Sequence, residues 1–148
     1  MSDIGDVELL LVEDNLDDLD MALHALRKMN RANRIQIARD GVEALDFIFC
    51  RGAFVSRKIE NGPKVVLLDL KLPKVDGLEV LRKIKGDPRT QLIPVVILTS
   101  SKEQRDLVES YRLGVNSYIV KPVNFVEFAE SVQQLGLYWL MLNQNPRP

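Results

Sequence analysis

The chain has 148 residues, 46% of them hydrophobic, and a formal net charge of -1 at pH 7. This length fits one domain, and the near-neutral charge argues against a broad nucleic-acid-binding surface, which needs a basic patch. The single cysteine, Cys50, excludes an internal disulfide. The N-terminal apolar run is too short for a membrane span and lacks the basic flank of a signal peptide. We therefore expect a soluble cytoplasmic protein without a membrane or nucleic-acid partner.

The first half of the chain predicts two strand–helix units. The apolar run at 7–12 indicates a strand, and a helical stripe follows at Leu19, Leu23, Leu26 and Met29. The alternating run at 34–38 indicates a second strand, and a second helical stripe follows at Val42, Leu45 and Ile48. The polar connection from Gly52 to Lys64 is long for such a unit.

Three further units follow. The nearly continuous apolar runs at 64–69 and 93–100 are typical of strands covered on both faces. They precede helical stripes at Val80, Leu81 and Ile84, and at Leu107, Val108 and Tyr111. The spacing of Ser101 and Gln104 predicts a capping box for the fourth helix. A strand at 117–120 leads to a last helix that Asn124 and Glu127 cap and that reaches about Leu142.

This fivefold alternation predicts an α/β fold. Parallel strands joined by right-handed crossovers should form a five-stranded sheet with helices on both faces. The expected strand order is 2-1-3-4-5, as in flavodoxin-like folds. We expect a single domain over 1–148, with a core of about 6–134 and a C-terminal helical extension of about 135–148.

Charged and hydroxyl side chains stand where the predicted strands end. The first run ends at Glu13 and Asp14, the third at Asp69, the fourth at Thr99 and the fifth at Lys121. In an open parallel sheet these ends converge. Three carboxylates in one cleft repel one another, and a magnesium ion with oxygen ligands relieves that repulsion. Asp69, ionised beside the metal and Lys121, is therefore predicted to be a nucleophile that accepts a phosphoryl group.

The motifs VEDN, LLDLKLPKVDG, ILTSS and YIVKP, in this order, resemble the receiver domain of two-component response regulators of the chemotaxis-regulator type. The resemblance implies that a histidine kinase phosphorylates Asp69. It also implies a Mg2+ site made by Glu13, Asp14, Asp69 and the backbone carbonyl of Lys71, in which Asp14 is a direct ligand and Glu13 acts mainly through metal-bound water. Lys121 would then pair with the phosphoryl oxygens. The implied function is signalling rather than enzymatic.

The same resemblance implies two conformational features. Thr99 and Tyr118 would form a switch pair that alters the face made by the fourth helix, the fifth strand and the fifth helix. The Lys121–Pro122 peptide bond would be cis. The segment before Pro63, the LPK motif, Tyr111 and the YW pair are similar to small response regulators that pair with phytochrome kinases.

The segment from Leu135 to Asn143, LGLYWLMLN, is apolar on every side apart from Gly136. One stripe can cover the sheet, but the rest would leave Tyr138 and Trp139 exposed, and such patches mark interfaces. We therefore predict a homodimer through this segment. The alternative, in which the segment folds back over its own domain and the chain stays monomeric, remains open.

Three other functions compete with the receiver hypothesis. An aspartyl-phosphate hydrolase usually has a second acid two positions after its nucleophile, where this chain has Lys71. A flavodoxin needs a phosphate loop after the first strand, and the acidic EDNLDDLD would repel a phosphate. A degenerate receiver that serves as a passive scaffold remains an alternative. His24 is expected to be an ordinary helix residue rather than a phosphohistidine.

Overall fold

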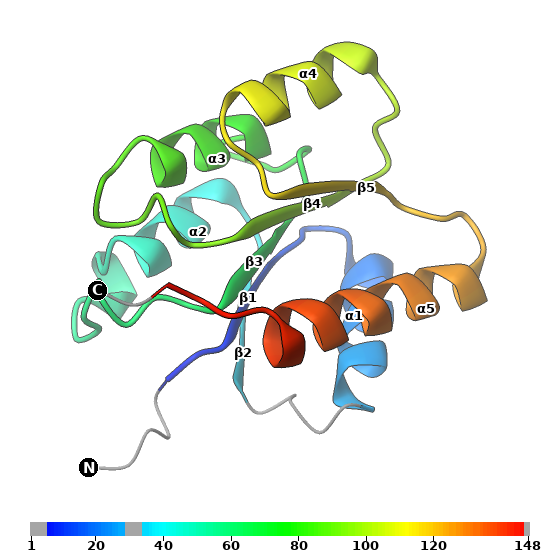
Figure 1. Ribbon diagram of the computed structural model, residues 1–148, viewed down its shortest axis with the longest axis horizontal. Helices are drawn as coiled ribbons and strands as arrows, with labels where there is room; N and C mark the ends of the chain where they lie inside the picture. The colour runs from blue at the N-terminus through cyan, green and yellow to red at the C-terminus, as the bar shows by residue number, and fades with distance from the viewer. Residues whose placement is uncertain (1–5, 29–33, 147–148) are drawn as a thin grey trace.

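The computed structural model describes residues 6–28 and 34–146. Five parallel strands form one sheet between two layers of helices (Figure 1). The strands are β1 (Leu9–Val12), β2 (Ile35–Ala38), β3 (Val65–Leu68), β4 (Val95–Thr99) and β5 (Ser117–Val120). Their order is β2-β1-β3-β4-β5, and each neighbouring pair is parallel. The predicted fold class and strand order are confirmed.

Helices cover both faces of the sheet. They are α1 (Leu16–Arg27), α2 (Gly41–Ile48), α3 (Gly77–Lys85), α4 (Gln104–Arg112) and α5 (Phe125–Gly136). A 3-10 turn (η3, Gly52–Phe54) lies in the long connection before β3, and a π-helix (η4, Leu137–Leu142) extends α5. Helices α1 and α5 lie on one face, and α2, α3 and α4 lie on the other (Figure 1). Met29, which we assigned to the first helical stripe, lies outside the described residues.

The central strands are buried on both faces. Because successive side chains of a strand point to opposite sides, Leu9 and Leu11 pack with α1 and α5, whereas Leu10 and Val12 pack with α2 and α3. This double burial explains the continuous apolar runs in the sequence. Charged side chains can therefore be accommodated next to β1 and β3 only where these strands end and the chain leaves the core. In the described part of the chain, no helix is both long and apolar enough to cross a membrane.

Two local expectations are wrong. The N-cap of α4 is Glu103, which makes no side-chain cap bond, because the Ser101 hydroxyl donates to Asp106 instead of forming a capping box. The described residues contain no cis peptide bond, so the Lys121–Pro122 bond is trans. The trans isomer before proline is favoured by about 0.5–1 kcal/mol even without help from the fold. By contrast, Asn124 caps α5 as predicted, accepting hydrogen bonds from the backbone N–H groups of Val126 and Glu127.

Gly41 brings the start of α2 against the loop that follows β3. Its N–H donates to the carbonyl oxygen of Pro73 at 3.2 Å. A Cβ at this position would lie 1.9 Å from the carbonyl oxygen of Val75. Two loops at the carboxyl edge of the sheet can therefore pack together only if this residue has no side chain.

Gly41→Ala should lower the free energy of unfolding by roughly 2 kcal/mol, because the new methyl group overpacks a backbone contact. Urea denaturation measures the change. Gly62→Ala is the control, because the nearest atom to its Cβ would be the terminal methyl of the Ile93 side chain, at 3.0 Å, and the nearest backbone atom would be 3.8 Å away. Equal losses in the two variants would contradict the account.

Candidate functional site

The polar residues at the strand ends converge on one edge of the sheet. Glu13 follows β1, Asp69 follows β3 and Lys121 follows β5. Backbone pairing continues past the strands and fixes their relative positions. The Asp69 N–H donates to the Val12 carbonyl at 3.1 Å, and the Lys121 N–H donates to the Thr99 carbonyl at 2.7 Å. The structure thus brings Glu13, Asp69 and Lys121 together, as the sequence analysis predicted.

The ammonium group of Lys121 is the centre of this cluster. Its Nζ lies 2.8 Å from Glu13 Oε1, 2.7 Å from Asp18 Oδ2 and 2.9 Å from Asp69 Oδ2. An ammonium has three N–H donors, so all three are engaged. Lys121 is itself almost buried, with 8% of its side chain exposed.

The sequence analysis missed Asp18 as a member of this cluster. The sequence analysis included it only within the acidic segment EDNLDDLD. Its position contained a signal, because residue 18 lies in the first turn of α1, which begins four residues after the end of β1. Asn15 caps this turn by accepting the Asp18 backbone N–H at 2.9 Å, which holds residue 18 beside the site.

The cluster holds more negative charge than one lysine balances. Burial, together with the nearby charge of Asp69, raises the pKa of Glu13 to about 7, although the hydrogen bond from Lys121 opposes this shift. Burial also disfavours the charged form of Lys121, but hydrogen bonds to Asp18, Glu13 and Asp69 outweigh it and raise the pKa of the ammonium. Lys121 thus stays charged, while Glu13 tends to take up a proton.

The other proposed metal ligands, Asp14 and Lys71, lie beside the cluster around Lys121. Asp14 is half-buried, and its backbone carbonyl accepts a hydrogen bond from Arg39 Nη2 at 2.9 Å. The backbone N–H of Lys71 lies 3.5 Å from Asp69 Oδ1. Across residues 6–28 and 34–146, no three His, Cys, Asp or Glu side chains are arranged to hold a metal ion, since the carboxylates turn to Lys121. The fit to magnesium therefore rests on the excess charge and on the oxygen donors, which suit a hard cation.

Thr99 and Tyr118 are linked through the backbone of Ser101. The fully buried Thr99 accepts the Ser101 N–H on its Oγ1 at 3.3 Å. The Tyr118 hydroxyl donates to the Ser101 carbonyl at 3.1 Å. Burial raises the pKa of Tyr118, so this phenol remains a hydrogen-bond donor. Both residues of the expected switch pair thus hydrogen-bond to the backbone of Ser101.

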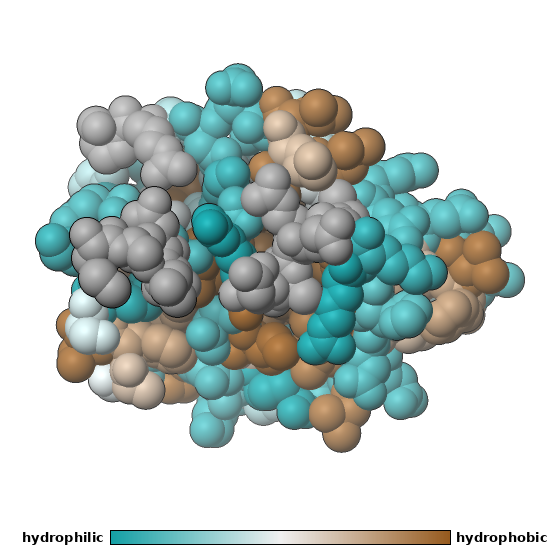
Figure 2. Space-filling model, turned by 90° about the horizontal axis from the view of Figure 1, so that it is seen from below, coloured by the Kyte–Doolittle hydropathy of each residue, from teal (hydrophilic) through white to brown (hydrophobic). Residues whose placement is uncertain are grey.

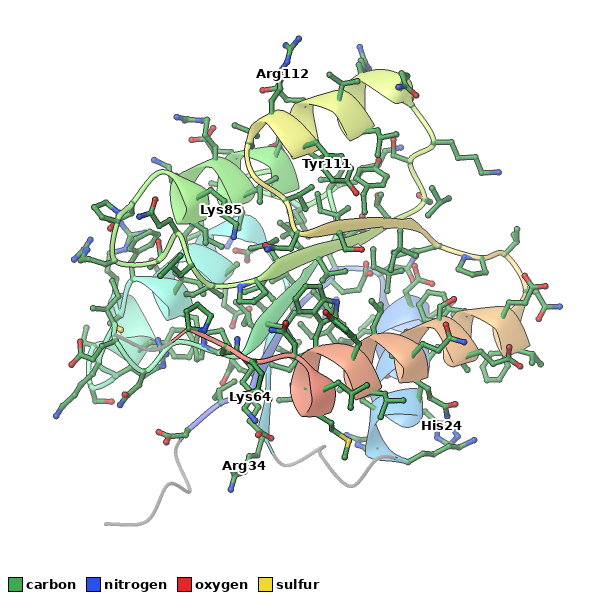
Figure 3. The ribbon with its side chains drawn as sticks, in the orientation of Figure 1. His24, Arg34, Lys64, Lys85, Tyr111 and Arg112 are labelled. Carbon is green, nitrogen blue, oxygen red and sulfur yellow. The ribbon has the colours of Figure 1, made fainter. Side chains whose placement is uncertain are left out.

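The C-terminal segment partly folds back over its own domain. Trp139 is half-buried against the core between the sheet and α1, so the expectation that it lies in water is wrong. Lys64, close to this segment in Figure 3, donates to the Leu140 carbonyl at 3.4 Å. Asn145 donates to the Lys64 carbonyl at 2.9 Å. These contacts hold the segment at the amino edge of the sheet.

Part of this segment nevertheless remains exposed. Tyr138 is 49% exposed, and the other exposed apolar side chains of the segment are Leu137, Met141 and Leu142. Viewed from below, hydrophobic groups alternate with polar ones across the surface (Figure 2). His24 is exposed on α1 and lies apart from the strand ends that form the site (Figure 3), which agrees with an ordinary helix residue.

Curated relatives cover nearly the whole chain. The probable methanogenesis regulatory protein FilR2 of Methanothrix harundinacea is 42% identical over 144 residues, covering 95% of this chain and 88% of that protein. Response regulator Rcp1 of Synechocystis sp. is 39% identical over 134 residues, covering 89% of this chain and 88% of Rcp1.

Solved structures share the fold. The phosphorylated cyanobacterial phytochrome response regulator RcpA superposes with a TM-score of 0.88 at 36% identity, covering 95% of this chain and 98% of that one. The Mn(2+)-bound form of Rcp1 gives a TM-score of 0.87 at 36% identity, covering 95% and 99%. The bacteriophytochrome response regulator AtBRR is 54% identical with a TM-score of 0.70, covering 93% and 98%.

Residues 9–133 match the family described as the response regulator receiver domain. This range includes Glu13, Asp69 and Lys121, the three residues that the fold brings together. Members of this family are signalling proteins, and two of the relatives above are phytochrome response regulators. The chain therefore belongs to the response regulator receiver domain family, with relatives of the phytochrome-associated type.

Proposed function

We propose that this protein is a single-domain response regulator that accepts a phosphoryl group on Asp69 from a histidine kinase in a magnesium-dependent reaction. The observation that carries the proposal is the buried Asp69 carboxylate, 2.9 Å from the Lys121 ammonium at the carboxyl edge of the sheet. The solved relative RcpA, which is described as phosphorylated, supports it.

In this reaction an oxygen of Asp69 attacks phosphorus as the bond to the donor imidazole nitrogen breaks. The imidazole leaves, and an acyl phosphate forms. Phosphoryl transfer is mainly a matter of positioning and charge neutralisation. Asp69 is positioned by the hydrogen bond that its backbone N–H donates to the Val12 carbonyl. The Lys121 ammonium would donate hydrogen bonds to the phosphoryl oxygens.

Magnesium would be held by the carboxylates of Glu13, Asp14 and Asp69 and by the backbone carbonyl of Lys71. When bound, it would neutralise charge on the transferred phosphoryl group and relieve the repulsion within the cluster. Two observations support this assignment. The cluster has more carboxylates than its lysine can balance, and the relative Rcp1 has a manganese-bound form.

We propose that the signal leaves the site through Ser101. If the Thr99 hydroxyl turns toward the phosphoryl group, it gives up the Ser101 N–H that it now accepts. Tyr118 holds the carbonyl of the same residue, so movement of this segment would reach β5. Helix α4 has only one buried residue, Ser110, so little apolar packing resists a change in the surface formed by α4, β5 and α5.

The proposed partner is a histidine kinase in the cytoplasm, and the phytochrome response regulators among the relatives favour a phytochrome as that kinase. A second copy of this chain is the other proposed partner. Four apolar side chains of η4 remain exposed to form such an interface: Leu137, Tyr138, Met141 and Leu142.

Asp69→Asn should abolish labelling by radioactive acetyl phosphate with magnesium, because an amide is not a nucleophile for phosphorus. Label retained on the protein after gel electrophoresis measures the reaction. Asp76→Asn is the control. It changes another aspartate near the same loop, and asparagine can still cap α3 as Asp76 does. Stoichiometric labelling of Asp69→Asn would place the phosphate elsewhere and overturn the proposal.

Glu13 should make the stability of the metal-free protein fall as pH rises. Its folded pKa of about 7 exceeds the ordinary value of 4.5, so folding favours the protonated carboxyl, and that contribution is lost as pH rises through the window between these values. Glu13→Gln cannot ionise and should show a flatter dependence of unfolding free energy over this window. Chemical denaturation at several pH values in EDTA compares the two. Parallel curves for both proteins would contradict the raised pKa.

Wild type should run as a dimer at micromolar concentration in gel filtration with light scattering. Tyr138→Ala combined with Leu142→Ser removes exposed apolar groups of η4 and should give a folded monomer. Trp139 is left intact because it packs in its own core. Leu92→Ala changes a residue that is 63% exposed elsewhere and should leave the dimer intact. A monomeric wild type, with and without beryllofluoride, would defeat this prediction.

A further inference from the structure

Asp18 differs from the other two acceptors of Lys121. Its side chain is 24% exposed, whereas those of Glu13 and Asp69 are 6% and 9% exposed. Its distance to Nζ, 2.7 Å, is nevertheless as short as theirs. Asp18 stands on α1 rather than at a strand end, and neither the phosphoacceptor role nor the proposed metal ligands include it.

The donor count of Lys121 sets a constraint. All three N–H groups of the ammonium point to carboxylates, so a phosphoryl oxygen can be bound only if one acceptor is released. Asp69 would carry the phosphoryl group, and the buried Glu13 carboxylate could leave Lys121 only if the proposed magnesium site took its charge, because water does not reach it. Asp18 can be solvated at the least cost. It also sits at the N-terminus of α1, where a free negative charge is favoured by the helix dipole.

We propose that Asp18 is a positioning residue that holds the Lys121 ammonium in the unphosphorylated protein and exchanges it for the phosphoryl group. This inference rests on the proposed function of Asp69. Asp18 thereby stabilises the resting state and competes with phosphorylation. Its negative charge also disfavours the incoming phosphoryl group.

The exchange predicts opposite effects on two measurable quantities. Asp18→Asn weakens the ion pair with Lys121, so the free energy of unfolding should fall. It also frees a donor and removes one negative charge, so beryllofluoride, an analogue of the phosphoryl group, should bind more tightly with magnesium. A purely structural role would lower stability without tightening binding. The α1 turn should persist in the variant, because Asn15 caps it through the backbone N–H of residue 18.

The test measures equilibrium binding of beryllofluoride in saturating magnesium by 19F NMR. The free energy of unfolding in urea is the second readout. Asp18→Asn should bind about three- to tenfold more tightly than wild type, the range that loss of a partly exposed competing ion pair allows. Asp18→Ala should shift affinity in the same direction. Asp17→Asn is the matched control. It removes the same charge from the same turn at an exposed position that is not among the acceptors of Lys121.

Tighter binding by both Asp18 variants, with Asp17→Asn like wild type, supports the exchange. If wild type binds beryllofluoride but the Asp18 variants bind equally or more weakly, the exchange is wrong while the phosphoacceptor function stands. Equal tightening by Asp17→Asn would reduce the effect to general electrostatics and overturn the role of Asp18. If wild type does not bind beryllofluoride with magnesium, both the proposed function and the exchange fail.

Discussion

One ammonium group shared by three carboxylates is the interaction on which the site depends. Lys121 joins the ends of β1 and β5, the loop after β3 and the first turn of α1. Carboxylates from three elements can lie this close only because a cation stands between them. The surplus of negative charge makes the cluster sensitive to any further charge that arrives, whether a metal ion or a phosphoryl group.

The sheet explains why this cluster forms at an edge. The central strands are buried on both faces, so ionised side chains are found only beyond the ends of these strands. Because the strands are parallel, their carboxyl ends lie side by side at one edge of the sheet. Gly77 contributes at the same edge, because a Cβ there would lie 2.3 Å from the carbonyl oxygen of Asp69. The backbone that presents Asp69 is therefore closely packed.

The contacts around Ser101 give the site a physical route to the surface. One peptide segment is held on its N–H side by Thr99 and on its carbonyl side by Tyr118. Its side chain also donates to Asp106 of α4. A change at Thr99 would therefore disturb β5 and α4 together. The weak apolar packing of α4 lowers the free-energy cost of shifting this helix.

The sequence predicted the fold and most of the cluster because both follow from periodicity and from the ends of apolar runs. Asp69 and Lys121 could be placed because parallel strands end at one edge. Asp18 was missed because its role depends on how α1 lies over β1, which a one-dimensional pattern does not specify. The capping box failed since the Ser101 hydroxyl found a tertiary partner. Trp139 was misplaced because a π-helix changes which side chains face the core.

The central claim is that Asp69 is the residue that carries the phosphoryl group. Borohydride reduction converts an aspartyl phosphate into homoserine, so peptide mass spectrometry after reaction with acetyl phosphate and magnesium locates it directly. The account predicts homoserine at position 69 and at no other aspartate. Homoserine at another aspartate, or phosphate retained on a serine or on His24 with Asp69 unmodified, would contradict it.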